Sequence, residues 1–148
     1  MELKALIISV LLVVIRVGVQ ASQTNSFFGG RSSVLITNDL PAPSKLIVHC
    51  KSGDDDLGIQ NLPTGGQKYW TFRPNIFGTT LFYCYFNWDN MVMSVEVFND
   101  KHDGGECTGH CLRSVRKDGI YFLNAKDGLW ERKKSWTPQN SKNIVNYQ

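Results

Sequence analysis

Residues 79–88 read Thr-Thr-Leu-Phe-Tyr-Cys-Tyr-Phe-Asn-Trp, and this run decides the fold class. Aromatic and β-branched residues pack well on a pleated sheet, so the run predicts a strand. Successive side chains of a strand point to opposite faces, which divides the run into two sets. One face is expected to carry Phe82, Cys84, Phe86 and Trp88, and the other Leu81, Tyr83 and Tyr85. Because both sets are largely apolar or aromatic, the strand is either central and covered on both sides or presents its tyrosines to a partner.

Segments of the same kind lie on both sides of this run and alternate with turn residues. They predict strands at residues 33–37, 45–51, 67–72, 91–98, 112–115 and 120–123, with a shorter one at 56–59. In residues 45–51 the inward face is expected to hold Leu46, Val48 and Cys50, opposite Ile47, His49 and Lys51. Strands of this length between turns, without a long helical periodicity or an internal repeat, predict an all-β fold, either a sandwich or a barrel.

The first 21 residues have the layout of a secretory signal peptide. Lys4 precedes an apolar run at residues 5–15 that only Ser9 interrupts, and residues 19–21 (Val-Gln-Ala) are small or modest in size, as at a signal-peptidase site. A membrane-spanning helix needs about 20 apolar residues, and Arg16 ends this run well before that length. We therefore expect cleavage after Ala21, secretion to the extracellular space and no membrane insertion.

The chain that remains after cleavage is close to neutral. The whole sequence has a formal net charge of +3, and removal of residues 1–21 lowers it to +2. That balance gives no reason to expect nucleic acid or a membrane surface as a partner. Residues 22–33 and 137–148 are largely polar, so we expect a loose N-terminal lead and a flexible C-terminal tail around the domain. The sequence does not indicate the oligomeric state.

Four cysteines are expected to form two disulfides, because an even number of cysteines behind a signal peptide enters an oxidising compartment. They are Cys50, Cys84, Cys107 and Cys111, and three pairings are open. The spacing of His102, Cys107, His110 and Cys111 could also suit zinc. Oxidised sulfurs are not zinc ligands, so the disulfide interpretation is preferred and no metal or cofactor is expected.

Three adjacent carboxylates, Asp54, Asp55 and Asp56, follow Ser52-Gly53. Carboxylates are ligands for calcium, but three neighbours in sequence cannot all face one ion without a bend, and the EF-hand spacing is absent. Aspartate side chains also accept hydrogen bonds from backbone groups two residues on, which is typical of turns. The segment is therefore expected to be an exposed turn and not a metal site.

Catalysis needs several side chains in a defined arrangement, and the sequence shows no such set. A two-histidine nuclease could use His49 with His102 or His110, but nothing in the pattern orients them. A glycosidase needs two carboxylates that flank the scissile bond, and the acidic residues leave such a pair open. Residues 130–136 (Trp-Glu-Arg-Lys-Lys-Ser-Trp) mix bases with tryptophans, and we interpret them as a terminal strand or turn whose tryptophans pack on the fold. The chain is not expected to be an enzyme.

An ordered set of segments resembles the plant self-incompatibility S1 family, whose members are also called S-protein homologues. Val48-His49-Cys50-Lys51-Ser52 followed by Asp55-Asp56-Leu57-Gly58 is similar to the hallmark segment of the family. The other similar segments are residues 34–40, residues 81–88, Cys107 with Cys111, residues 117–121 and residues 130–136. One position departs from the family pattern, because Leu112-Arg113-Ser114 stands where an aromatic residue usually follows the last cysteine.

This resemblance implies a small antiparallel β-sandwich at residues 34–136, stabilised by two disulfides, and a secreted plant protein. It also implies an extracellular ligand for a plasma-membrane receptor on a responding cell, as in the inhibition of incompatible pollen or a related form of cell–cell communication. The candidate recognition loop is then Asp54, Asp55 and Asp56, since loops on a rigid scaffold carry recognition. Two other classes stay open, a secreted cell-wall or glycan-binding module and a small secreted hydrolase.

Overall fold

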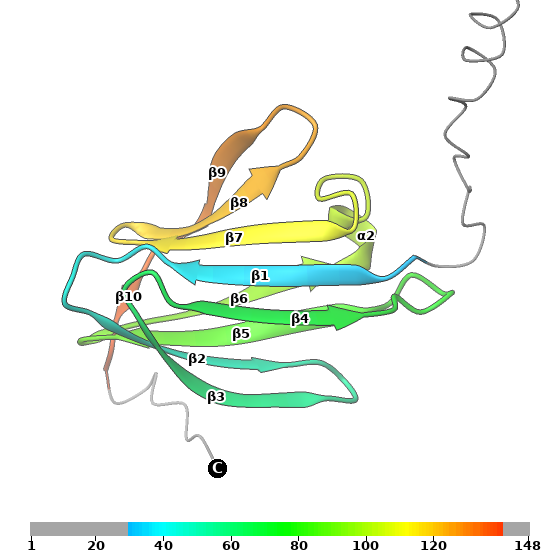
Figure 1. The fold of residues 1–148 in the computed structure, drawn as a ribbon. Coiled ribbons are helices and arrows are strands. Elements are labelled where there is room, and N and C mark those ends of the chain that lie inside the picture. The colour runs from blue at the N-terminus through cyan, green and yellow to red at the C-terminus, as the bar shows by residue number, and fades with distance from the viewer. Residues whose placement is uncertain (1–29, 141–148) are drawn as a thin grey trace, which may run out of the picture.

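In the computed structural model, which describes residues 30–140, the chain folds into two β-sheets packed face to face (Figure 1). Ten strands and one short helix are found in that range. The elements are β1 (Ser32–Asn38), β2 (Lys45–Lys51), β3 (Asp56–Pro63), β4 (Gln67–Phe72), β5 (Leu81–Trp88), β6 (Met91–Asn99), α2 (Asp100–Asp103), β7 (His110–Arg116), β8 (Gly119–Asn124), β9 (Leu129–Lys134) and β10 (Thr137–Pro138). The predicted all-β sandwich is confirmed.

The strand order shows one feature that the sequence did not predict. The first sheet has the order β4-β1-β7-β8-β9, and the second has the order β10-β6-β5-β2-β3. All pairings are antiparallel except that of β1 with β7, which is parallel and aligns Leu35 with Leu112. The sandwich is therefore antiparallel, as predicted, in every strand pairing but this one. Turn signals define hairpins between neighbouring strands, whereas a parallel pair needs a long crossover that local patterns do not mark.

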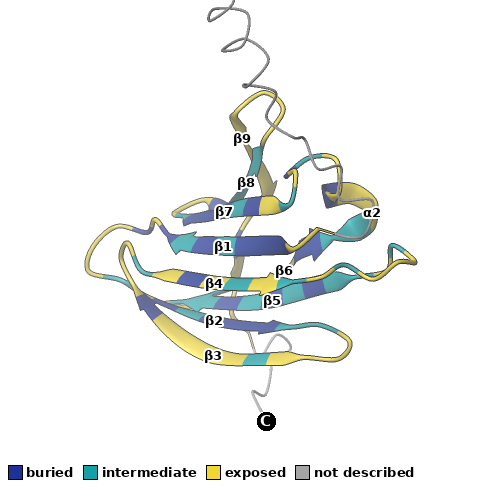
Figure 2. Cartoon of the chain, turned by 45° about the vertical axis from the view of Figure 1, so that its right-hand side comes forward, coloured by how far each residue is buried: buried dark blue, intermediate teal, exposed yellow. Residues whose placement is uncertain are grey.

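The core follows the alternation of the strands. Phe82, Cys84 and Phe86 of β5 are buried, as are Leu46, Val48 and Cys50 of β2. Trp88, expected on the same face, is only half-buried and packs against Trp136, with the ring centroids 5.8 Å apart. Figure 2 shows the buried residues concentrated in the central strands, while β3 and β9 at the sheet edges are largely exposed.

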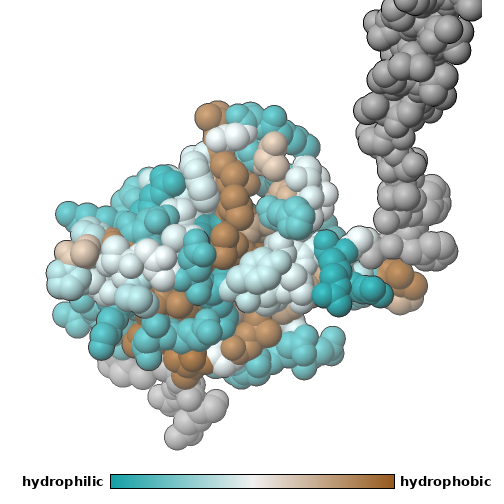
Figure 3. Space-filling model, viewed as in Figure 1, coloured by the Kyte–Doolittle hydropathy of each residue, from teal (hydrophilic) through white to brown (hydrophobic). Residues whose placement is uncertain are grey.

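The outer face of the first sheet carries an apolar row across its strands. Leu35 of β1 lies opposite Tyr69 of β4 and Leu112 of β7, and Leu123 of β8 lies opposite Trp130 of β9. Hydrophobic surface runs across these strands in Figure 3. Tyr69 and Trp130, at the two ends of the row, are exposed.

The predicted boundaries shift slightly. β1 begins at Ser32, inside the segment expected to be a loose lead, and Thr137 and Pro138 pair with β6, inside the expected tail. Trp136 is buried and its indole N–H donates to the Arg116 carbonyl at 2.9 Å. The chain is therefore packed against the sandwich as far as this residue. The predicted signal peptide at residues 1–21, most of the lead and residues 141–148 lie outside the described residues. Between residues 30 and 140 no helix has the length and apolar character to cross a bilayer.

Candidate functional site

Both disulfides lie in the scaffold, and they resolve the pairing that the sequence left open. Cys50 and Cys84 lie opposite each other on β2 and β5, and their Sγ atoms are bonded. Cys107 and Cys111 close a short loop at the start of β7. All four sulfurs are consumed in this way, which leaves no thiolate for the zinc arrangement with His102 and His110. In the part of the chain that the structure describes, no group of three His, Cys, Asp or Glu side chains could hold a metal ion.

The acidic turn between β2 and β3 is organised by Ser52. The Ser52 hydroxyl accepts hydrogen bonds from the backbone N–H groups of Asp55 at 2.9 Å and Asp54 at 3.3 Å, and the Ser52 N–H donates to the Asp55 carbonyl at 2.8 Å. The turn is therefore formed by a serine side chain and the backbone. The carboxylates of Asp54 and Asp55 are exposed and form no hydrogen bond or ion pair with any residue between 30 and 140. They are free to contact a partner.

Asp56 has a different role from its two neighbours. Its carboxylate accepts from the Gly58 N–H at 2.9 Å, lies 2.7 Å from Nε2 of His49 and lies 3.1 Å from Nζ of Lys51. The bond from Gly58 and then the bond from His49 lower the pKa of Asp56 well below its ordinary value. These contacts fasten the start of β3 to β2. The predicted loop is thus divided into two projecting carboxylates and one that stabilises the turn.

His49 lies on the face of β2 opposite Val48, as expected, yet it is buried. Ile59 of β3 and Tyr85 of β5 lie opposite it on the two neighbouring strands, and Asp56 bonds its ring. His110 belongs to the other sheet, where its Nδ1 lies 2.9 Å from the Ser33 hydroxyl. His102 lies on α2. The three histidines are therefore distributed over different elements, and the structure does not assemble the nuclease pair that the sequence left open.

A hollow of about 520 Å³ separates the acidic turn from the β4–β5 loop. Residues 52–55 form one wall, and Arg73, Asn75 and Thr79 belong to the opposite loop. No local pattern predicts this hollow, because its walls come from segments about 20 residues apart that the pairing of β2 with β5 brings together.

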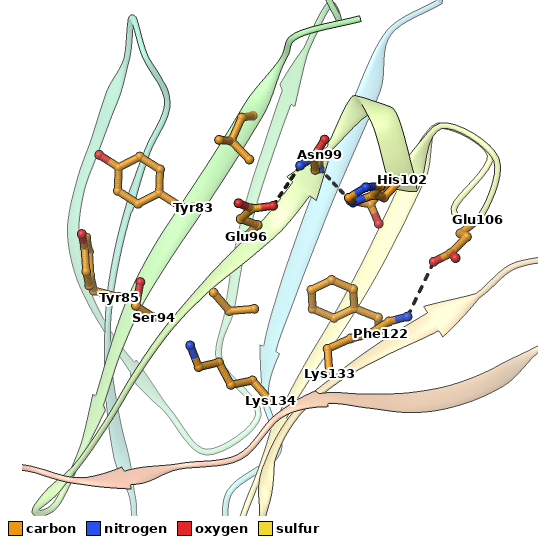
Figure 4. Close-up of a pocket in the computed structure, with 13 residues that line it drawn as sticks. Tyr83, Tyr85, Ser94, Glu96, Asn99, His102, Glu106, Phe122, Lys133 and Lys134 are labelled. Atoms are coloured by element: carbon orange, nitrogen blue, oxygen red, sulfur yellow. Dashed lines mark hydrogen bonds and ion pairs between the residues drawn. The ribbon is translucent and has the colours of Figure 1, made fainter.

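A larger groove of about 910 Å³ opens on the outer face of β5 and β6 and extends to β9 (Figure 4). Tyr83 and Tyr85 form one side, with ring centroids 5.7 Å apart and the rings nearly perpendicular. Ser94 and Glu96 follow from β6, and Lys133 stands on the opposite side. The remaining lining residues are Leu81, Val95, Asn99, His102, Asp103, Glu106, Phe122 and Lys134. The second aromatic face predicted for β5 thus lines a groove.

Three charged side chains of the groove, Glu96, Glu106 and Lys133, form hydrogen bonds or ion pairs with neighbouring residues. The Asn99 amide donates to Glu96 at 2.9 Å, and Nζ of Lys133 lies 3.7 Å from Glu106 and 2.8 Å from Glu131. The groove brings Glu96 and Glu106 to one surface, which the sequence alone could not predict. Two carboxylates beside paired tyrosines suit polar contact with a hydroxyl-rich ligand as well as they suit hydrolysis.

Arg113 supports the wall of this groove from inside the sandwich. Its Nη2 lies 3.0 Å from Oδ1 of Asp103, its Nε–H donates to the Val97 carbonyl at 2.8 Å, and Cζ lies 3.7 Å from the centroid of the Phe122 ring. Burial lowers the pKa of Arg113 to about 10, and the charge of Asp103 opposes that shift. The departure at Leu112-Arg113-Ser114 is therefore a buried charge with a dedicated partner.

The family model and the curated relatives that match this chain belong to the same family. The model of the family described as "Plant self-incompatibility protein S1" matches residues 33–136. Among curated proteins, S-protein homolog 2 of Arabidopsis thaliana is 38% identical over 108 residues, which cover 70% of this chain and 67% of that protein. S-protein homolog 1 of the same plant is 36% identical over 107 residues, 70% of each chain. Self-incompatibility protein S1 of Papaver rhoeas is 32% identical over 117 residues, 72% of this chain and 83% of that protein.

A solved structure shares the fold. It is described as one of the "SPH (Self-Incompatibility Protein Homologue) proteins, a widespread family of small, highly stable, secreted proteins from plants". It superposes with a TM-score of 0.52 at 24% sequence identity, and the match covers 74% of this chain and 92% of that one.

Proposed function

Since the chain belongs to the plant self-incompatibility protein S1 family, a family of small secreted plant proteins, we propose that it acts outside the cell as a ligand for a receptor on a responding plant cell. Its action lies in pollen self-incompatibility or in a related form of cell–cell communication. The role of a ligand requires a rigid scaffold, an exposed surface that a receptor can recognise, and no turnover.

The acidic turn carries this proposal. Asp54 and Asp55 project from a turn that Ser52 orders, and Asp56 fastens the turn to β2 beside the Cys50–Cys84 bond. Two carboxylates on an ordered turn steer approach to a basic surface, and the backbone that carries them loses little conformational entropy on binding. Because neither carboxylate contributes to the packing of residues 30–140, the pair is available for specificity.

A glycan-binding module is the second candidate, and the tyrosine-lined groove favours it. Tyr83 and Tyr85 offer aromatic surface, while Ser94, Glu96 and Asn99 offer hydrogen-bonding groups around it. A groove with aromatic sides and a few convergent polar groups suits a sugar chain. Hydrolysis ranks below binding, because Glu96 and Glu106 are each engaged by a neighbour, Asn99 and Lys133.

The test uses the secreted protein, fluorescently labelled, on intact protoplasts from tissues of the source plant. We expect saturable binding to the cells of one tissue that disappears when surface proteins are removed with trypsin, together with a response of those cells. Binding that survives trypsin but is competed by soluble cell-wall polysaccharide would favour the glycan-binding module. No saturable binding to any tissue would contradict the proposed function.

A further inference from the structure

The loop between β4 and β5 presents two large apolar side chains to solvent. Ile76 is 91% exposed and Phe77 is 81% exposed, more than any other large apolar side chain in residues 30–140. The loop projects at one end of the sandwich in Figure 1, and hydrophobic surface protrudes at the same end in Figure 3. Single exposed apolar residues are common on protein surfaces, but an adjacent pair at the tip of a loop is not explained by packing.

Hydrogen bonds to Asn75 hold this tip in one conformation. The Asn75 side-chain oxygen accepts from the N–H groups of Phe77 at 3.1 Å and Thr79 at 3.0 Å, and its amide donates to the Thr79 hydroxyl at 2.5 Å. The Asn75 N–H donates to the Thr80 hydroxyl at 2.8 Å, and Gly78, at φ 65°, completes the turn. Every one of these bonds involves the backbone or polar side chains. The side chains of Ile76 and Phe77 take no part in these bonds, so the loop displays them to solvent.

The tip lies beside the acidic turn. The hollow of about 520 Å³ has Asp54 and Asp55 on one wall and the base of the tip, Arg73 and Asn75, on the other. The hollow thus lies between the two unengaged carboxylates and the base of the tip, which carries Arg73 and leads directly to Ile76 and Phe77. This arrangement is that of a protein–protein contact, in which apolar anchors enter pockets at the centre and charged groups surround them.

We propose that Ile76 and Phe77 are the apolar anchor of the receptor contact, and that they enter a pocket of the receptor protein whose rim carries lysine or arginine side chains facing Asp54 and Asp55. This inference rests on the proposed function and adds to it the chemistry of the partner surface. Asp54 and Asp55 outnumber Arg73 around the hollow, so the charge at this site disfavours a lipid bilayer with anionic headgroups. A second copy would bring the same acidic turn to the contact, and like charges would oppose it.

The experiment compares three double variants of the secreted protein. Ile76→Ser/Phe77→Ser removes the anchor, and Ile76→Leu/Phe77→Leu keeps its apolar character. Tyr69→Ser/Leu129→Ser is the matched control, since those side chains are 61% and 63% exposed on the first sheet. Thermal unfolding, binding to trypsin-treated and untreated plasma-membrane vesicles of the responding tissue, and sedimentation equilibrium are measured for each. Protein-free vesicles of phosphatidylcholine with and without phosphatidylserine complete the set.

We expect unchanged thermal midpoints, at least tenfold weaker trypsin-sensitive binding for the serine anchor variant, and losses within about threefold for the leucine variant and the matched control. Equal binding of the serine variant and the natural sequence would overturn the inference while leaving the proposed function intact. Anchor-dependent binding to protein-free vesicles, or an anchor-dependent dimer, would overturn it in favour of a lipid or a second copy. Absence of trypsin-sensitive binding by the natural sequence would contradict both proposals.

Discussion

Arg113 and Asp103 form an ion pair inside the sandwich, with Nη2 and Oδ1 3.0 Å apart and the two side chains 1% and 7% exposed. The other oxygen of Asp103 accepts from the Asn99 N–H at 2.6 Å, so the pair links β7 to the start of α2. Burial raises the pKa of Asp103, and the charge of Arg113 opposes that change. The pair therefore fixes the segment that closes one end of the groove.

Removal of one member of this pair should destabilise the protein more than removal of both charges. Arg113→Met leaves Asp103 buried without its counter-charge, which costs about 3–5 kcal/mol of unfolding free energy. In Arg113→Met/Asp103→Asn no charge is left unpaired, and we expect the loss to be smaller than that of Arg113→Met alone. Urea unfolding of four chains measures the difference: the natural sequence, Arg113→Met, Asp103→Asn and the double variant. A double variant as unstable as the sum of the two single variants would show that the charges are not coupled.

Asp56 should make stability depend on acid pH. Its folded-state pKa lies below the unfolded value near 3.8, so its ionised carboxylate stabilises the fold above that value. The contribution is lost as the pH falls from about 4 toward the lower folded-state pKa. Asp56→Asn should therefore lower stability at pH 7, and the difference from the natural sequence should shrink at pH 2.5. An unchanged difference between the two pH values would contradict the assigned role of the ionised carboxylate.

The two disulfides should contribute unequally. Cys50 and Cys84 are separated by 34 positions and Cys107 and Cys111 by 4, so the first closes a much longer loop in the unfolded chain. Loop-closure entropy predicts losses of roughly 4 kcal/mol for Cys50→Ala/Cys84→Ala and roughly 2 kcal/mol for Cys107→Ala/Cys111→Ala. Thiol titration of the unfolded, unreduced natural protein should find no free thiol. A larger loss from the short loop would contradict the entropic account.

The groove should show no turnover. We expect no cleavage of RNA or plant polysaccharides by the purified protein, because the histidines are dispersed and both glutamates of the groove are engaged. Product analysis and isothermal titration with oligosaccharides check this. Cleavage abolished by Glu96→Gln or Glu106→Gln would establish a hydrolase instead. Saturable binding lost in Tyr83→Ala/Tyr85→Ala, without cleavage, would establish the glycan-binding module.

Alternation along the strands predicted the core, because it depends only on which residues are neighbours at a spacing of two. Phe82, Cys84 and Phe86 are buried for this reason. The parallel pairing of β1 with β7 and the choice among three cysteine pairings depend on which distant segments meet, and no local pattern encodes that. Family resemblance pointed to Arg113 as unusual, but only the structure identified Asp103 as its partner.

The surface features were also predictable only where they depend on local sequence. The acidic turn was predicted as a turn, because serine, glycine and aspartate favour that local conformation. The different role of Asp56 could be recognised only from the structure, which places its carboxylate beside His49 and Lys51 of the neighbouring strand. Ile76 and Phe77 gave no signal in the sequence, since two apolar residues in a short segment are as compatible with a core as with an exposed tip.

The proposed function requires a receptor that recognises this protein through its acidic turn. The most direct measurement compares the natural sequence with Asp54→Asn/Asp55→Asn in trypsin-sensitive binding to responding cells at low and high salt, with Asp127→Asn as the matched control. We expect an unchanged thermal midpoint, weaker binding of the double variant at low salt, and convergence at high salt, where charge steering is screened. Equal binding of all three chains at low salt, or unfolding of the double variant without a separate loss of binding, would contradict the account.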